Sequence, residues 1–262
     1  MLPLQKPTLW NADPGIIEYN CRKHGMPVPV VAIPMWEGAG NRAVDLSGNG
    51  NHADIGDTIW DNGLVKNTSS LLDIPNSPSI NSINNNNEYT VVLGLNRNIA
   101  NTSYLAIGKP LRSSDAAEIT FSLTISWSTP ASGYAWRLHH AHSWTNKKLL
   151  DNVKSASTDK QIVGLYDGSY MRLYTNGVPT VSLATTTIPG TTSDNLTAGG
   201  HASTTYDYTY IYNRALSPYQ VKFLNDDPYF MFRVPDELYG YAAAAGVSIP
   251  VLIHQMQQQG IL

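Results

Sequence analysis

The sequence predicts an all-β protein, a two-sheet antiparallel sandwich with one short helix and an extended arm at each end. Three observations indicate this: a series of short apolar runs bounded by turn-forming residues, a strict two-residue alternation in one run, and an Asn-Gly pair between two others. A single domain of this class reaches about 200–250 residues, and the chain has 262. One hydrophobic core is therefore expected.

The apolar runs from Val30 onward are the expected strands. In the run Ile119–Trp127, apolar residues alternate with Ser and Thr, so this strand has one buried face and one solvated face. The expected strands are Val30–Met35, Leu71–Ile74, Tyr89–Leu95, Tyr104–Ile107, Ile119–Trp127, Ala135–His142, Gln161–Tyr166, Tyr170–Tyr174, Val178–Leu183 and Tyr206–Tyr212.

Turn residues join three of these runs, within residues 161–183, into a meander. Asp167-Gly168-Ser169 separates the first run from the second, and Asn176-Gly177 separates the second from the third. Asn-Gly favours a tight type I′ hairpin, because both of its residues take a positive φ there. Three sequential antiparallel strands are therefore expected.

One segment before the tail has a helical pattern, Ser217–Leu224. Ser217 can cap the helix, Pro218 fits its first turn, and Val221 and Leu224 share one face. A short helix is expected to close the sandwich.

The two ends of the chain are expected to lie outside the sandwich, which spans residues 30–225. Residues 1–29 are predicted to form an extended arm, because their five prolines remove backbone donors and disfavour helix. Residues 226–262 are predicted to be an assembly arm, whose apolar part is shorter than the roughly 20 residues that span a bilayer. The side chains expected to bury against a neighbouring subunit are Val247, Ile249, Val251, Leu252 and Ile253.

Composition excludes several classes of protein. Hydrophobic residues make up 42% and charged residues 14%, which excludes intrinsic disorder. The net charge of -3 and the lack of a long basic run give no basis for nucleic-acid binding. The first ten residues carry no uninterrupted apolar stretch of the kind that a secretory signal needs, so no export by that route is expected.

Three motifs occur in the same order as in a known family. They are Ala32–Gly40 followed by Val44–Ala53, then Asp167–Gly177, and then Tyr206–Ser217. They resemble the opening strand and glycine-rich loop, the hairpin, and the closing strand of LamG-like jelly-roll domains, of the concanavalin A-like type. The resemblance covers about residues 30–225 and implies a jelly-roll sandwich. It departs from the family where Thr175-Asn176 stands in place of Val-Asp and where Asp159-Lys160-Gln161 stands in place of Trp-His-His.

A further segment, Leu224–Phe232, resembles the continuation that follows such domains in structural genes of tailed bacteriophages. This implies a non-enzymatic virion protein, a capsid decoration or tail-associated subunit made in the host cytoplasm. Its partners would be copies of itself, other virion proteins and surface glycan. A carbohydrate-binding, lectin-like module is the alternative, and a glycan-active enzyme is a third hypothesis.

Acidic residues are spaced unfavourably for glycoside hydrolysis, which needs two carboxylates facing one bond. On a strand such a pair stands two or four residues apart, and no two acidic residues here are two apart. Asp57 and Asp61 are four apart, but turn residues surround them. We therefore expect no hydrolase.

Aromatic and histidine residues around position 140 are candidates for ligand binding. His140 and His142 share a strand face and are flanked by Trp136 and Trp144. The alternative is a packed aromatic strand. Cys21, the single cysteine, adjoins Arg22 to His24, a basic setting that could lower its pKa, and is interpreted as a lone thiol at a contact surface.

A structural Ca²⁺ is the ion hypothesis that the sequence supports. Asp45, Asn49 and Asp207 offer hard oxygen ligands in the opening and closing motifs, which the resemblance brings together. The alternative is that Asp45 and Asn49 only hydrogen-bond their own turn.

Overall fold

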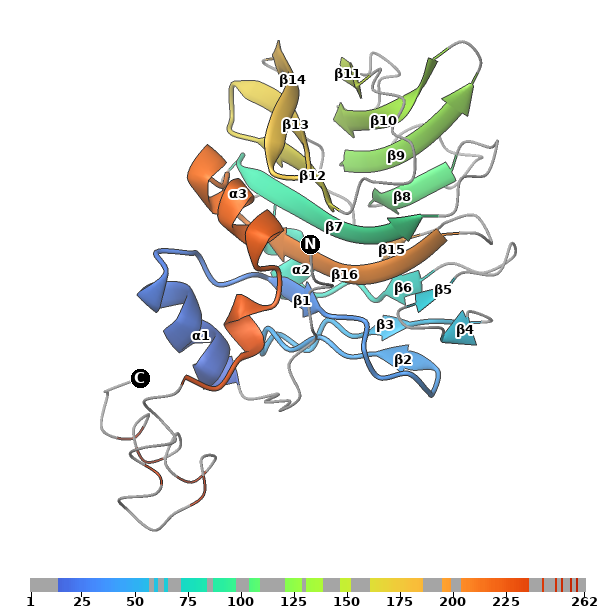
Figure 1. The fold of residues 1–262 in the computed structure, drawn as a ribbon. Helices are drawn as coiled ribbons and strands as arrows, with labels where there is room; N and C mark the ends of the chain where they lie inside the picture. Colours follow the sequence, from blue (N-terminus) through green and yellow to red (C-terminus); the bar gives the residue numbers. More distant parts are fainter. Residues whose placement is uncertain are drawn as a thin grey trace.

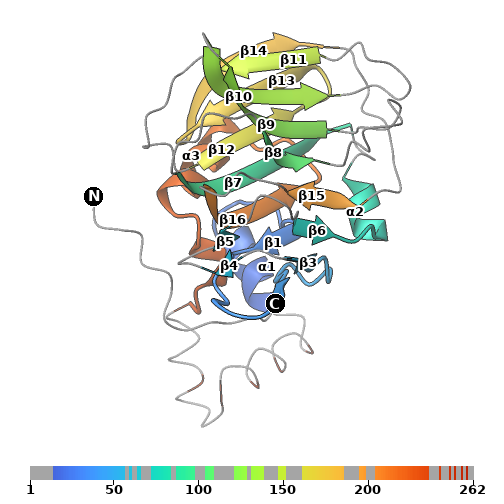
Figure 2. The ribbon, with the colours of Figure 1, turned by 90° about the vertical axis from the view of Figure 1, so that its right-hand side faces the viewer.

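The computed structural model describes most of the chain and confirms the all-β sandwich. The described residues are 14–56, 59–60, 64–65, 72–83, 87–97, 104–108, 121–128, 131–138, 147–151, 161–185, 195–198 and 204–235, with five single positions beyond 235. Two antiparallel sheets of eight strands face each other (Figure 1). In Figure 2 both sheets run from β14 and β11 at the top to β4 and β3 at the bottom.

The first sheet contains a strand from each of the three sequence motifs. In spatial order its strands are β14 (Val178–Ala184), β13 (Tyr170–Thr175), β12 (Gln161–Tyr166), β7 (Tyr89–Arg97), β16 (Thr204–Tyr212), β5 (Leu64–Val65) and β4 (Ile59–Trp60), and β1 (Val31–Ile33) pairs with β16.

The second sheet faces the first across the core. In spatial order its strands are β11 (Lys147–Asp151), β10 (Ala131–Leu138), β9 (Phe121–Ser128), β8 (Tyr104–Gly108), β15 (Leu196–Ala198), β6 (Leu72–Ile74), β3 (Ala53–Asp54) and β2 (Arg42–Ala43).

The predicted meander is present as β12, β13 and β14, which are neighbours in the first sheet. Asn176 and Gly177 connect the last two with φ values of 51° and 76°. Both values are positive, as the type I′ hairpin requires. The sequence therefore located these strands and their tight turn correctly.

A core of aliphatic and aromatic side chains fills the space between the sheets. Strand residues contribute to it in alternation, as expected where one face of a strand is buried. Its members include Val91, Leu93, Leu95, Met171 and Leu173 from the first sheet and Leu72, Ile74, Ile107 and Leu196 from the second.

A second apolar layer covers the outer face of the first sheet. Two helices and a 3₁₀ turn form it: α1 (Pro14–Lys23), α3 (Pro218–Asp226) and η1 (Phe230–Phe232). In Figure 1, both helices lie on the left, α3 beside the ends of β7 and β16 and α1 below it. A further short helix, α2 (Pro78–Ser82), is capped by the Ser77 side chain. The molecule therefore has three layers where the sequence predicted two.

A β-bulge in β16 directs its tyrosines into the second layer. Tyr206 pairs with Leu95, and both lie in the core between the sheets. Asp207 is then an extra residue, and Tyr208 pairs with Gly94 on the opposite face. Tyr210 and Tyr212 follow on that same outer face.

The prediction of an extended arm over residues 1–29 is wrong for the part that the structure describes. Pro14–Lys23 is helical, and Ile16, Ile17 and Cys21 are fully buried. A proline at a helix start does no harm, because the first N–H has no partner within the helix. The side-chain amide of Asn20 donates to the carbonyls of Met231 (3.1 Å) and Arg233 (2.7 Å), which joins α1 to η1.

The predicted domain end at residue 225 is also too early. The helix at Ser217 is confirmed, with the complete capping box between Ser217 and Gln220. The chain then continues into buried residues, Tyr229 to Phe232, and the Tyr210 hydroxyl donates to the Pro228 carbonyl at 2.9 Å. Residues up to Pro235 therefore belong to the folded domain.

Cys21 does not lie on a contact surface, and its pKa is raised, not lowered. Helix α1 places it on the buried face, and burial, with a smaller effect from Glu18, raises the pKa of the thiol to about 12. We expect a thiol reagent at pH 8 to leave the native protein unlabelled and to label it rapidly in denaturant, since only the thiolate reacts. Rapid labelling of the native protein would contradict this placement of α1.

Candidate ligand-binding site

An open cavity of about 430 Å³ lies where the β12–β13 hairpin meets the start of α3. We call it the hairpin–helix cavity. Two segments far apart in the sequence form its walls. The lining residues are Asp167, Arg172, Tyr174, Ala215, Leu216, Ser217, Pro218 and Gln220.

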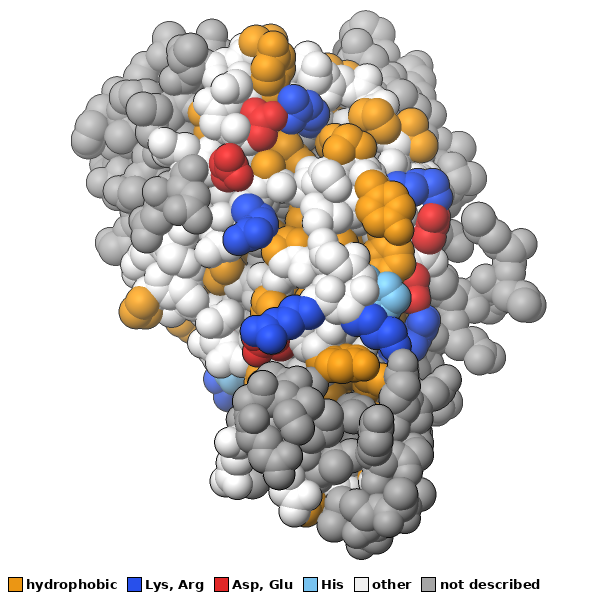
Figure 3. Space-filling model, turned by 90° about the vertical axis from the view of Figure 1, so that its left-hand side faces the viewer, with side chains coloured by type: hydrophobic (Ala, Val, Ile, Leu, Met, Phe, Trp, Pro, Cys, Tyr) orange, Lys and Arg blue, Asp and Glu red, His pale blue; other side chains and the backbone are white. Residues whose placement is uncertain are grey.

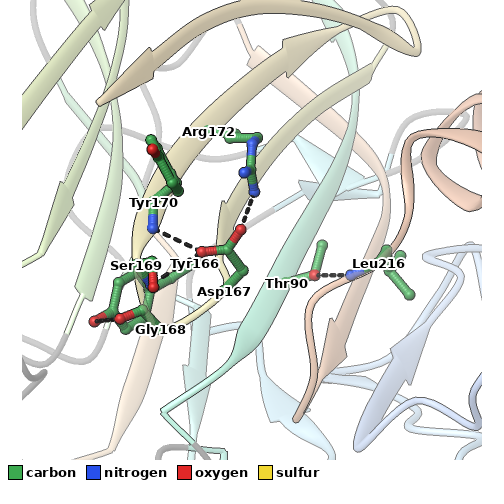
Figure 4. A network of polar contacts seen from close by, with 8 residues as sticks. All are labelled: Thr90, Tyr166, Asp167, Gly168, Ser169, Tyr170, Arg172 and Leu216. Atoms are coloured by element: carbon green, nitrogen blue, oxygen red, sulfur yellow. Dashed lines mark hydrogen bonds and ion pairs between the residues drawn. The ribbon is translucent and has the colours of Figure 1, made fainter. Parts of the chain in front are cut away.

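The hairpin wall is organised by one carboxylate. Asp167 accepts hydrogen bonds from the backbone N–H groups of Ser169 (3.0 Å) and Tyr170 (2.6 Å), and it forms an ion pair with Arg172 (Figure 4). Gly168 takes a φ of 84° in this turn, and its carbonyl accepts a hydrogen bond from the Tyr166 hydroxyl at 3.1 Å. The Asp167 carboxylate and the Tyr166 hydroxyl therefore both stabilise this turn. The bonds from the turn N–H groups in return fix the direction in which the carboxylate points.

Alternation along β13 decides which side chains reach the cavity. Met171 and Leu173 point into the core between the sheets. The residues between them belong to the outer face. On that face, the Arg172 guanidinium lies 5.1 Å from the centre of the Tyr170 ring, in a cation–π contact. Tyr170 is 43% exposed, so its ring is accessible beside the cavity.

The helix wall is anchored to the first sheet by a buried threonine. The Thr90 hydroxyl donates to the carbonyl of Arg214 at 2.9 Å. It also accepts from the N–H of Leu216 at 3.0 Å, as Figure 4 shows. Gln220 accepts from the N–H of Ser217 and donates to the carbonyl of Gly25 at 2.7 Å. Hydrogen bonds therefore hold the backbone of both cavity walls in place.

The charges in the cavity balance each other. Burial alone would raise the pKa of Asp167, but the hydrogen bonds from Arg172, Tyr170 and Ser169 and the charge of Arg172 outweigh it and lower that pKa. Asp167 is thus ionised near neutral pH and compensates Arg172. Figure 3 shows the side of the molecule on which α3 lies, where positive, negative and hydrophobic side chains are interspersed.

The cavity combines hydrogen-bond donors and acceptors with an aromatic surface. Its volume falls within the range of about 300–1,000 Å³ that small-molecule sites occupy. Asp167 accepts hydrogen bonds, Arg172 donates them, and the Ser217 hydroxyl can do both. Such an arrangement suits a neutral ligand rich in hydroxyl groups.

The structure places Asp45 and Asn49 in a self-contained loop. The Asp45 carboxylate accepts from the N–H groups of Ala32, Ser47 and Asn51 and from the Ser47 hydroxyl. The Asn49 amide donates to the Val30 carbonyl at 3.0 Å and to the Ser47 hydroxyl at 3.1 Å.

These contacts favour the alternative in which Asp45 and Asn49 bond their own loop. Both carboxylate oxygens of Asp45 are already used by donors, which does not fit a calcium ligand. Asp207, the third proposed ligand, is the bulge residue of β16. Within the part of the chain that the structure describes, no three His, Cys, Asp or Glu residues form a metal-binding group. The calcium site stays a prediction that these contacts do not support.

The other predicted site residues are only partly covered by the structure. Trp136 pairs with Leu123, and Leu123 pairs with Ile107, which is buried in the core between the sheets. Trp136 therefore lies in β10, opposite Leu123 of β9. Of the remaining candidates, Val251 is 46% exposed, and His140, His142, Trp144, Val247, Ile249, Leu252 and Ile253 lie outside the described residues.

Sequence reasoning missed the hairpin–helix cavity. Asp167 and Arg172 belong to the hairpin motif, which by itself predicts a turn and a strand and no cavity. The available signal was the spacing of Tyr170 and Arg172, which puts an aromatic ring and a cation on one strand face directly after a turn aspartate.

Comparisons with known proteins identify similar folds. No protein-family model and no curated protein matches the chain. The binding domain of Paraclostridial Mosquitocidal Protein 1 matches with a TM-score of 0.60 and 14% identity, over 77% of this chain and 52% of that one. The binding domain of botulinum neurotoxin DC in complex with SialylT matches with a TM-score of 0.54 and 12% identity, over 76% and 51%. Trypanosoma rangeli sialidase in complex with the inhibitor DANA matches with a TM-score of 0.55 and 16% identity, over 81% and 35%.

These matches show the fold and nothing finer. The chain spans about half the length of the two toxin domains and about a third of the sialidase. The β-sandwich predicted from the sequence is thus shared with binding domains of toxins and with a sialidase. Membership of the LamG-like family and a role in a virion stay predictions from the sequence. Among the described residues, no helix is long and apolar enough to cross a membrane.

Proposed function

We propose that the chain is a carbohydrate-binding, lectin-like module that holds a saccharide in the hairpin–helix cavity. The observation that carries this proposal is the ion pair of Asp167 and Arg172 at the cavity wall, with the 43% exposed ring of Tyr170 beside it. The likeness to toxin binding domains, one of them in complex with SialylT, supports it.

A saccharide matches this chemistry. Its hydroxyl groups donate and accept, and Asp167 and Arg172 offer an acceptor and several donors side by side. Its C–H surface is apolar, and an exposed tyrosine ring covers such a surface at small entropic cost. Because hydrogen bonds to the backbone fix both walls, the protein loses little conformational entropy when it binds the saccharide.

Binding without hydrolysis is the favoured activity. Asp167 is the one carboxylate among the residues that line the cavity. Glycoside hydrolysis commonly uses two carboxylates about 5–10 Å apart, one of them protonated. The pKa of Asp167 is lowered, which is unsuitable for a general acid.

The test is a glycan array followed by calorimetry on the best ligand, with two variants. Arg172→Met should weaken binding at least tenfold, because it removes the donors and the cation–π partner of Tyr170. Lys222→Met is the control, since Lys222 pairs with Asp226 on the exposed side of α3. Retention of affinity in Arg172→Met, or an array without any bound glycan, would overturn the proposal.

A further inference from the structure

We infer that the hairpin–helix cavity selects uncharged saccharides and discriminates against sialylated ones. This inference rests on the proposed function and names the class of ligand. Its basis is the arrangement of the two charges in the cavity wall.

Arg172 is the one cation among the lining residues, and it is already paired. A sugar carboxylate is recognised best by an arginine whose paired N–H groups point at it. Here one terminal nitrogen of Arg172 donates to Asp167, and the guanidinium lies over the Tyr170 ring. A second carboxylate bound to the other N–H groups of this arginine would lie close to the Asp167 carboxylate, because both would share one guanidinium.

Asp167 cannot easily move aside for such a ligand. Its other oxygen accepts from the N–H groups of Ser169 and Tyr170, so rotation of the side chain would break both bonds and open the turn. An anionic sugar would therefore stand next to a fixed negative charge, and like charges at this distance repel. A neutral sugar meets no such penalty.

No other lining residue changes this balance. The remaining six residues around the cavity are uncharged: Tyr174, Ala215, Leu216, Ser217, Pro218 and Gln220. The nearest charges on α3, Lys222 and Asp226, compensate each other. The residues that line the cavity thus carry no net charge to attract a sialic acid.

The experiment measures affinity for pairs of glycans that differ only by a terminal sialic acid, such as lactose and sialyllactose. In the unmodified protein, the neutral member of each pair should bind at least tenfold more tightly. Asp167→Asn should reduce that preference at least tenfold, because the amide oxygen still accepts from Ser169 and Tyr170 while Arg172 becomes uncompensated. The double variant Lys222→Met and Asp226→Asn, which removes both members of an ion pair outside the cavity, should leave the preference unchanged.

The outcomes separate the two proposals. Tighter binding of the sialylated member by the unmodified protein would overturn this inference and leave the proposed function standing. Binding of neither member of any pair would overturn the proposed function. An unchanged preference in a folded Asp167→Asn variant would overturn the charge argument, and the comparison in the unmodified protein does not depend on that variant.

Discussion

Replacing Gly94 by alanine should destabilise the protein by about 3 kcal/mol or prevent folding. A Cβ at Gly94 would lie 2.2 Å from Cε1 and 2.4 Å from Cδ1 of Tyr208. That ring cannot yield, because it stacks on Tyr210 at 4.8 Å, meets Tyr229 edge-on, and its hydroxyl accepts from the Gln161 amide. In a strand with room, alanine would instead gain about 0.5–1 kcal/mol over glycine.

Urea unfolding of a double-mutant cycle measures this effect. Tyr208→Ala removes the ring, so in that background Gly94→Ala should change stability by less than about 1 kcal/mol. The two substitutions are therefore expected to be strongly non-additive. An additive cycle would mean that the ring does not lie over Gly94.

Replacing Asn20 by alanine should lower the free energy of unfolding by about 2–4 kcal/mol, because two backbone carbonyls lose their donor. The carbonyls belong to Met231 and Arg233 and lie in the layer that joins α1 to η1. Chemical denaturation at neutral pH measures the loss.

Glu18→Ala is the matched control on the same helix. Glu18 pairs with Arg22 on the exposed side of α1, and such pairs contribute less than about 0.5 kcal/mol on an exposed helix surface. Equal effects of the two substitutions would contradict the packing of α1 on η1. If residues 1–29 formed an extended arm, as the prolines suggest, Asn20→Ala would instead leave the free energy of unfolding unchanged.

The elements that sequence reasoning found are those with local signals. Asn176-Gly177 defines its turn by backbone conformation, and Ser217, Pro218 and Gln220 define the start of α3 by capping. These signals depend on a few adjacent residues. Distant packing does not alter them.

The elements that it missed depend on distant packing. Helix α1 has no acidic residue in its first turn and only ten residues, too few for an isolated helix in water. It is stable because Ile17 and Cys21 pack on the first sheet and Asn20 bonds to η1. Proline content alone therefore suggested an extended arm.

The candidate site was missed for the same reason. The local sequence around Asp167 and Arg172 predicts a turn and a strand. The opposite wall of the cavity, however, comes from residues 215–220, more than forty positions later. Only the register of β7 with β12 and β16, and the Thr90 contacts with Arg214 and Leu216, bring the walls together.

The bulge at Asp207 also determines where the chain can change length. Loops between strands accept inserted or deleted residues at small cost. Loss of Asp207 would likewise leave the side chains of β16 on their present faces, because Tyr206 would still pair with Leu95 and Tyr208 with Gly94 in a strand without a bulge. Loss of Thr209 would instead reverse the phase of the strand, turning Tyr210 and Tyr212 toward the second sheet and Ile211 toward the helices. Within β16, deletion of a single residue in relatives of this chain should therefore occur at Asp207 and be absent from the segment between Tyr208 and Tyr212.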